Sequence, residues 1–476
     1  MLSEELIDLV KRIQNRKYEE QTIEVKAAQG GCPKLYETLS SFSNQNTGGI
    51  IVFGLDEKQH FAPVGVYDVQ DLQHHATEQC KQMEPVVRPV FSVCEIDGKF
   101  FVSMEIPAVE AAERPVYYKG SGRWQGSYVR VGDADEHMTD YEIYSFDAYR
   151  KQIRDDIRET SVSADSLDKN LVENYLRNVR MNRVNTSNMS DEELLELMGL
   201  TKGGKPTLSA VLCFSKYPQA QFPQLCVTAV LVPGTHIGDT SEDGQRFMDN
   251  KRIEGTIRQM VEGAVNFVAM NMRAGVRIQN GKRSDVTQYP LTAVREAILN
   301  ALVHRDYSPY SEGIPVRVEM YQDRLEIVNA GGLYGAIDID ELGRIHADTR
   351  NKTLISVLET LKVVENRYSG IPTIRKQLAE NGLPEPVFQD KRGLFRVIFY
   401  NSSGQNTGGK PLTLEEYCRV PRTRKEVANF LGVTQAYAIQ RYIVPLIEKG
   451  VLVYTIPDKP KSHDQRIVIA DSRAQK

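Results

Sequence analysis

Three polar side chains recur at helical spacing in REAILNALVHRDY, residues 295–307. At about 100° per residue, Glu296, Asn300 and His304 share one face of a helix. An exposed helix would favour Lys, Glu or Ala over Asn, so this polar face requires a chemical explanation. An apolar stripe lies almost opposite it and comprises Leu291, Val294, Ile298 and Leu302.

Two short segments of alternating hydrophobicity follow this helix and lead to a pair of glycines. Residues 316–321 and 324–328 are predicted to be strands joined by a tight two-residue turn. The second strand delivers Asn329, Gly331 and Gly332 to its carboxyl end. A polar helix face is thus followed, in order, by two strands and a glycine pair.

This order resembles the GHKL type of ATP-binding fold, shared by histidine kinases, type II topoisomerases and chaperones. That fold places Glu-x-x-x-Asn on a helix that faces the nucleotide, and a D-x-G box ends a nearby strand. Glu296 and Asn300 match the first motif. The resemblance implies that the Asn300 oxygen holds magnesium against the phosphates of ATP or ADP, and that Glu296 orients an attacking water.

A divergent bacterial branch of this fold, often labelled RecG-like, is more similar still. It shares the helix at 295–307, the strand DRLEIVNAGGL, the pair Arg350-Asn351 and a segment like residues 364–372. The resemblance covers about residues 160–400. It implies a cofactor site comprising Glu296, Asn300, Asn329, Gly331, Gly332 and Gly370.

Two departures from the family pattern bear on the chemistry. Asn329 stands where the wider fold has an Asp that reads adenine, and Tyr368-Ser369-Gly370 replaces the usual Gly-x-Gly. Fewer glycines leave fewer backbone positions able to approach phosphate closely. We therefore expect nucleotide binding with slow hydrolysis or none. A solvated helix face with an incidental Asn is the alternative interpretation.

Acidic residues gather near the amino terminus. The strand pattern of IEVK places Glu24 and Lys26 on one face. Glu19 precedes this strand, and Asp56 and Glu57 lie in a turn after a second, buried strand. Three carboxylates that converge repel one another and are best tolerated with Mg²⁺ or Mn²⁺ among them.

These segments resemble the Schlafen-type AlbA domain, whose signature is E-x(4)-E-[FVY]-K, then N-[ST]-x-G-G and G-V-D-[DE]. In animal relatives the acids form a metal-dependent ribonuclease site, whereas in bacterial relatives the domain is assigned to DNA binding. The matching positions are Glu19, Glu24 and Lys26, residues 44–49, Gly54, Asp56 and Glu57, and YVRVG at 128–132.

Two interpretations of these acids remain open. In the first, Glu19, Glu24 and Asp56 hold the metal of a nuclease that cleaves RNA or DNA. Lys26 and Glu57 would complete its catalytic site. In the second, Glu24 pairs with Lys26 or with an Arg on the sheet surface, and Asp56 and Glu57 merely begin a polar turn. The lack of a clear general base nearby favours binding without cleavage.

The carboxy-terminal residues 412–476 show the order of a winged helix-turn-helix. A helix at 424–431, a turn and a second helix precede two strands around loop 458–464. Residues 411–476 hold eleven Lys or Arg against seven Asp or Glu, a net charge of +4 that favours nucleic acid. A winged helix used for protein contacts is the alternative. The residues expected to contact DNA are Gln435, Tyr437, Gln440, Arg441, Lys459, Lys461 and His463.

A second nucleotide-binding motif is rejected. Residues 199–205, GLTKGGK, match the opening of a P-loop, but Pro206 stands where Ser or Thr would bind magnesium. The segment follows a predicted helix and precedes TLSAVLCF, a predicted strand, whereas a P-loop follows a strand and opens a helix. We predict a turn here. Without a P-loop or a second helicase motif, we expect no helicase activity.

Composition bounds the remaining possibilities. A chain of 476 residues suggests about three domains, and 41% hydrophobic with 26% charged residues predicts folded, globular structure. The net charge of -4 means that any attraction to nucleic acid is local. Six cysteines without a C-x-x-C pair are predicted to be buried, reduced thiols. No run of about 18 apolar residues occurs, so we expect a soluble cytoplasmic protein with no membrane partner.

These observations predict a multidomain α+β protein. An AlbA-like domain at 1–150, with a hairpin at 114–133, precedes a helical and α/β region at 151–400 whose GHKL-like core spans about 290–400. A linker at 401–411 leads to the winged helix. We expect a transcriptional regulator that binds DNA, with RNA as a further partner, and whose central module responds to a nucleotide or another ligand. A metal-dependent nuclease and a weak ATPase are the enzymatic alternatives, and symmetric DNA sites would favour a homodimer.

Overall fold

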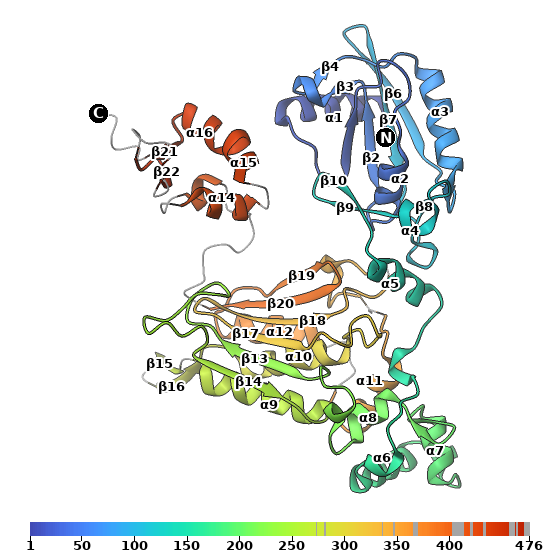
Figure 1. The fold of residues 1–476 in the computed structure, drawn as a ribbon, viewed down its shortest axis with the longest axis vertical. Helices are drawn as coiled ribbons and strands as arrows, with labels where there is room; N and C mark the ends of the chain where they lie inside the picture. Colours follow the sequence, from blue (N-terminus) through green and yellow to red (C-terminus); the bar gives the residue numbers. More distant parts are fainter. Residues whose placement is uncertain are drawn as a thin grey trace. The chain divides into compact units, whose positions relative to one another are not determined.

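The chain forms two compact units, Met1–Ser402 and Ser403–Lys476 (Figure 1). The structure is a computed structural model in which no helix of the described residues is long and apolar enough to cross a membrane. It describes residues 1–272, 274–279, 282–335, 337–345, 348–364, 370–401, 414–418, 422–431, 435–456, 462 and 465–470.

The amino-terminal domain is built on a four-stranded sheet with helices on both faces. The strand order is β1 (Ile23–Lys26), β2 (Gly49–Phe53), β7 (Lys99–Ile106) and β6 (Val90–Ile96), with only β1 and β2 parallel. Successive strand residues point to opposite faces. The helices α2 (Tyr36–Ser43) and α3 (Val69–Lys81) therefore share one core with Ile51 and Phe53, whereas α1 (Ser3–Arg16) shares another with Val52.

The hairpin predicted at residues 114–133 is only partly confirmed: its two arms meet at a single antiparallel bridge, Tyr117 with Ser127, and each arm otherwise pairs with another strand. β8 (Tyr117–Tyr118) pairs with β5 (Met83–Glu84), and β9 (Tyr128–Val131) pairs with β10 (Ala134–His137). A short helix, α4 (Gly122–Gly126), separates β8 from β9. Alternation identified the strands, but the glycines around α4 turn the chain so that each strand meets a different partner.

A helical region follows the connecting helix α5 (Asp140–Arg150). It contains α6 (Lys169–Asn182), α7 (Asp191–Leu197) and α8 (Leu208–Phe214). The strand predicted for TLSAVLCF is wrong, because this segment forms α8. The predicted turn at 199–205 is confirmed, since β11 (Thr201–Lys202) and β12 (Lys205–Pro206) form a tight hairpin there.

The central module is a six-stranded sheet with helices packed on it. The strand order is β14 (Asp249–Ile253), β13 (Val227–Leu231), β17 (Val316–Met320), β18 (Arg324–Ala330), β20 (Leu394–Tyr400) and β19 (Val387–Lys391). Only β13 and β17 are parallel. A separate hairpin joins β15 (Ala274–Gln279) to β16 (Lys282–Thr287).

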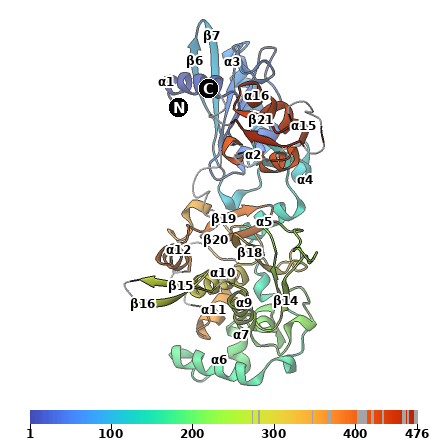
Figure 2. The ribbon, with the colours of Figure 1, turned by 90° about the vertical axis from the view of Figure 1, so that its left-hand side faces the viewer.

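The predicted helix with two faces is confirmed as α10 (Leu291–Val303). It packs against α9 (Ile257–Asn271) and α12 (Gly370–Glu380), and α9 and α10 lie side by side in both views (Figures 1 and 2). Val294, Ile298 and Leu302 are buried in the core. Leu291, the first residue of the helix, is 37% exposed and does not belong to the buried stripe. A further helix, α11 (Lys352–Thr360), follows the loop after β18.

The second unit has a small core of its own. Its described helices are α13 (Leu414–Tyr417), α14 (Arg424–Leu431), α15 (Gln435–Ala438) and α16 (Val444–Glu448), with a π-helical turn at Ile439–Ile443. β21 (Leu452–Tyr454) and β22 (Ile467–Ile469) then pair antiparallel. The core comprises Leu414, Cys418, Val427, Ala428, Ala438, Ile443, Leu452 and Ile467.

Candidate ligand site

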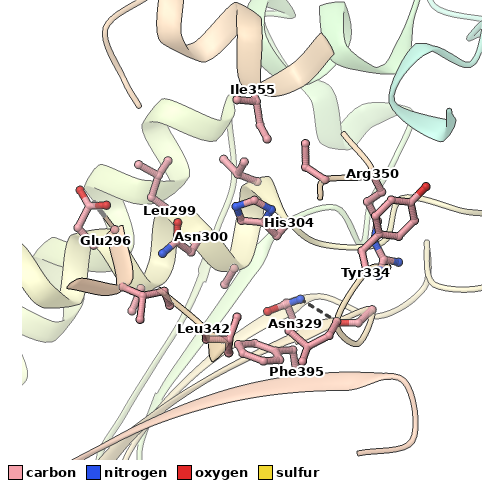
Figure 3. A pocket seen from close by; sticks show the side chains of 18 of the residues that line it. Glu296, Leu299, Asn300, His304, Asn329, Tyr334, Leu342, Arg350, Ile355 and Phe395 are labelled. Atoms are coloured by element: carbon pink, nitrogen blue, oxygen red, sulfur yellow. Dashed lines mark hydrogen bonds between the residues drawn. The ribbon is translucent and has the colours of Figure 1, made fainter. Parts of the chain in front are cut away.

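The residues assigned to a cofactor site from sequence line a single cavity of about 650 Å³ in the central module (Figure 3). Cavities of about 300–1,000 Å³ are typical of small-molecule sites. The polar face of α10 forms one wall, the end of β18 forms another, and the start of α12 closes a third side. The residues brought together in this way are Glu296, Asn300, Asn329, Gly331, Gly332 and Gly370.

The first residue of α12 lies directly against the polar face of α10. A Cβ atom on Gly370 would lie 3.1 Å from Nδ2 of Asn300 and 3.4 Å from Oε2 of Glu296. Glycine therefore lets the start of α12 approach both side chains closely. The unpaired N–H groups at a helix start favour negative charge, and Mg²⁺ prefers carboxylate and amide oxygens. This corner combines features suited to a phosphate and its metal ion.

Asn329, the last residue but one of β18, has its side-chain amide already bonded to the backbone. Nδ2 donates to the Ala330 carbonyl at 3.0 Å and to the Gly331 carbonyl at 3.4 Å. A carboxylate at this position could not donate these bonds. Because the amide hydrogens face the backbone, Oδ1 is the atom of Asn329 left to accept a hydrogen bond from a ligand.

The two glycines after β18 allow the chain to pass close to neighbouring polar groups. Gly331 has a φ of +93°, and a Cβ there would lie 2.8 Å from the backbone nitrogen of Asp306. A Cβ on Gly332 would lie 2.5 Å from Oδ1 of Asp390. Asp390 also accepts a hydrogen bond from the Leu333 amide at 2.8 Å. Residue 331 thus requires glycine for both conformation and space, whereas a side chain at residue 332 would displace the Asp390 carboxylate.

Arg350 is a cavity residue that sequence reasoning missed, although it was part of the matched Arg350-Asn351 pair. Its Nη2 donates to the Gly332 carbonyl at 2.7 Å, and its guanidinium lies 5.0 Å from the centre of the Tyr334 ring. Its Nη1 lies 3.9 Å from a carboxylate oxygen of Asp306. Its Nε is a buried donor with no partner among the described residues. Arg350 therefore brings positive charge to the cavity wall, and its buried Nε could bond a ligand only if the guanidinium moved.

His304 was placed on the polar face of α10 but given no role, and the structure places it in the cavity wall. Its ring faces the cavity and is exposed there. The surrounding protein, with a smaller effect from the charge of Arg350, lowers the pKa of His304 below its usual value. The ring is neutral at pH 7 and can exchange hydrogen bonds with a ligand without contributing charge.

The acids of the amino-terminal domain form an ion-pair network around a buried arginine. Arg130 on β9 places Nη2 2.8 Å from Oε2 of Glu24 and Nη1 3.0 Å from Oδ1 of Asp135. The Lys26 ammonium lies 2.5 Å from the other oxygen of Glu24. Glu19 lies at the edge of the network, 3.7 Å from Arg130. These contacts agree with the interpretation in which Glu24 pairs with Lys26 and with an Arg.

The metal site predicted from Glu19, Glu24 and Asp56 is not seen, because other groups hold these carboxylates. Asp56 caps a 3-10 turn, accepting from the Lys58 amide at 3.0 Å and from Gln59 at 2.8 Å. Across the described residues, no group of three or more His, Cys, Asp or Glu is placed to hold a metal ion. Arg130 and Lys26 supply the positive charge that a metal would otherwise provide.

Within this network, Glu19 has a pKa far from its usual value. Its Oε1 accepts a hydrogen bond from the Val25 amide at 2.8 Å. Burial first, and then the nearby charge of Glu24, raise the pKa of Glu19 to about 8. Glu57 contributes a smaller effect in the same direction. Glu19 is therefore the acid of this cluster that takes up a proton near neutral pH.

Comparison with known protein families places both regions. Residues 19–139 match the family described as "Schlafen, AlbA_2", and residues 313–399 match "Putative ATP-dependent DNA helicase recG C-terminal". The chain contains an AlbA_2 domain and a RecG C-terminal module. The second match begins after α10, so Glu296 and Asn300 precede it, whereas Asn329 and Gly370 lie within it.

Two solved structures are similar to parts or all of the chain. The DIP2311 protein from Corynebacterium diphtheriae is 16% identical, with 98% of this chain and 97% of that chain covered and a TM-score of 0.40. The N-terminal domain of a RecG-related protein from Nitrosomonas europaea is 26% identical over 28% of this chain and 93% of that chain, with a TM-score of 0.23. No curated protein matches. The domain assignments rest on the two family matches.

The residues predicted to contact DNA fall into two groups. Gln435, Tyr437, Gln440 and Arg441 are exposed, and the last two lie in the π-helical turn that interrupts the second helix. Their exposure leaves them accessible to a partner. The other predicted DNA contacts are Lys459, Lys461 and His463, which lie outside the described residues. Tyr368 and Ser369 of the second glycine box also lie outside them.

Proposed function

We propose that the RecG C-terminal module, with α10, binds an adenine nucleotide and Mg²⁺, and that the protein is a nucleic-acid-binding regulator controlled by this ligand. One observation carries the proposal: the polar face of α10, the β18 glycines and Gly370 line the same cavity. Residues from three separate sequence segments would not converge in this way merely to solvate a helix.

The residues of the cavity fit this ligand. A Cβ on residue 370 would narrow the space in front of Asn300 and Glu296. Both side chains carry oxygen atoms that can bind a metal ion. When bound there, Mg²⁺ would neutralise phosphate charge. Asn300 would hold the ion, Glu296 would orient a water, Arg350 would contact an anionic group, and Oδ1 of Asn329 would accept from the base. With Ser369 in the second glycine box, we expect slow hydrolysis or none.

Nucleic acid binding is supported by charge and by accessibility. The carboxy-terminal unit carries the excess of Lys and Arg, and Gln435, Tyr437, Gln440 and Arg441 are exposed on it. We interpret its helices and hairpin as a winged helix-turn-helix that contacts DNA. The description of the family matched at 313–399, which names a DNA helicase, agrees with an association with DNA.

Ligand-induced stabilisation tests the nucleotide site. ATP or ADP with Mg²⁺ should raise the melting temperature, because a ligand at a hundredfold excess over Kd stabilises the folded state by about 2.7 kcal/mol. Asn300→Ala should abolish this rise. Asn170→Ala, an exposed position on α6, should retain it and serves as the matched control. A melting temperature unchanged by every adenine nucleotide would contradict the proposal.

A further inference from the structure

Helix α5 connects the AlbA_2 domain to the RecG C-terminal module and contacts both. On the AlbA_2 side, α5 packs against the 3-10 turn at Ala111–Glu113. Asp147 of α5 also accepts from Nη2 of Arg123 in α4 at 2.7 Å. On the other side, the Tyr144 ring lies 4.7 Å from the ring of Tyr310 in the central module. The helix is therefore anchored at both ends of the connection.

Three side chains link α5 to the ligand cavity. The Tyr149 ring of α5 meets the Tyr334 ring edge-on, with 5.0 Å between centres. Tyr334 lines the cavity, and the Arg350 guanidinium lies 5.0 Å from the centre of the same ring. Gly335, with a φ of +86°, allows this approach because a Cβ there would lie 3.1 Å from Tyr149. A change at Arg350 can thus reach α5 through the Tyr334 ring, and also through Tyr141 of α5, whose hydroxyl interacts with Arg350 and Asp306.

The segment after α5 makes a second connection to the same wall of the cavity. Asp156, which is 1% exposed, accepts from the backbone amides of Thr353 and Leu354 at 2.8 and 3.3 Å and so caps α11. Arg154 donates to Oγ1 of Thr353 at 2.8 Å. Lys352, the residue before Thr353, lines the cavity. The connection and the residues at 350–353 are therefore held together by these hydrogen bonds.

We propose that Arg350 senses an anionic group of the bound ligand and that α5 transmits this state to the AlbA_2 domain. The inference rests on the proposed nucleotide site and adds its regulation. Arg350 is 9% exposed, lines the cavity and has one buried donor, Nε, without a partner among the described residues. A phosphate supplies that partner and draws the guanidinium from the Gly332 carbonyl and the Tyr334 ring. Tyr334 then repacks against Tyr149.

Hydrogen exchange of the full-length protein tests this coupling. With Mg²⁺ present, ADP should slow exchange of the amides in α5 and in β9–β10, whereas adenosine, which has no phosphate, should leave β9–β10 unchanged. Tyr149→Leu should keep the rise in melting temperature with ADP but lose the change in β9–β10. The control Tyr217→Leu, an exposed ring whose hydroxyl bonds Glu254, should behave like the wild type.

Arg350→Met separates sensing from general binding. Loss of a charge-assisted hydrogen bond should weaken ADP binding about tenfold or more and leave adenosine binding unchanged. A rise in melting temperature with ADP, without any change of exchange in α5 or β9–β10 of the wild type, would overturn the coupling alone. No rise with any adenine nucleotide would overturn the proposed function and this inference with it. The wild-type measurement decides the question even if a variant fails to fold.

Discussion

A single arginine explains how several acids share one buried corner of the AlbA_2 domain. The Arg130 side chain is 1% exposed and pairs with Glu24 and Asp135, while Lys26 covers the far oxygen of Glu24. Buried charges are tolerated only when they are paired and hydrogen-bonded. The family motif can therefore be read as the acidic half of an ion-pair network, with its basic half about a hundred residues later on β9.

The first prediction separates this network from a nuclease site. In Mn²⁺ we expect the wild type to bind DNA or structured RNA without cleaving it, because Arg130 and Lys26 already form ion pairs with the Glu24 carboxylate. Lys26→Ala should weaken nucleic acid binding if the ammonium also contacts phosphate. Gel assays of binding and cleavage measure both effects. Metal-dependent cleavage that disappears in Glu24→Gln would establish the nuclease instead.

The second prediction concerns the pH dependence of stability and follows from Glu19. The folded-state pKa of Glu19 is about 8, above its ordinary value of 4.5, so between these values the folded state binds the proton more strongly. The free energy of unfolding should therefore fall as pH rises from about 5 to 8. Glu19→Gln, which keeps the acceptor for the Val25 amide, should remove this contribution. Urea unfolding at several pH values measures it, and equal pH dependence in both proteins would contradict the assignment.

At the scale of helices and strands, the spacing of apolar residues predicted the elements that have a polar side as well as a buried one. α10 and the strands β17 and β18 were found because polar residues recur among their apolar ones at helical or strand spacing, although β18 is buried at every position after Arg324. α8 was missed because all seven of its residues are buried, and a short, fully buried segment shows neither helical nor strand period. Arg350 was missed as a ligand residue because only the folded loop brings it beside Gly332 and Tyr334.

The third prediction tests the turn that ends β18. Gly331→Ala should destabilise the protein by about 1–3 kcal/mol, since a side chain is strained at this positive φ and would press on Asp306. It should also weaken nucleotide binding by displacing one wall of the cavity. Gly313→Ala is the control, because a Cβ there meets nothing within 4 Å. Denaturant unfolding and thermal shift with ADP measure both effects, and a Gly331 variant as stable as the control would refute the argument.

At the scale of the whole chain, the excess positive charge and the candidate ligand site lie in different units. The ligand cavity and the Arg130 network belong to the first unit, while the excess positive charge lies in residues 411–476. Composition could reveal this separation because charge is additive along a sequence. The connection through α5 could not be predicted, since it depends on aromatic contacts between residues almost two hundred positions apart, such as Tyr149 and Tyr334.

The last prediction tests whether the carboxy-terminal unit or the AlbA_2 domain binds DNA. Removing residues 411–476 should lower DNA affinity and flatten its salt dependence, because each phosphate that the protein no longer neutralises reduces the slope of log K against log salt by about 0.9. The remaining chain should stay folded, since the carboxy-terminal unit has its own core. In the full chain, Arg441→Gln should reproduce part of the loss, whereas Arg258→Gln, an exposed helix residue of the first unit paired with Glu262, should not. Titrations at several salt concentrations measure these slopes. If truncation leaves affinity and slope unchanged, DNA recognition lies in the AlbA_2 domain and the carboxy-terminal unit contacts protein.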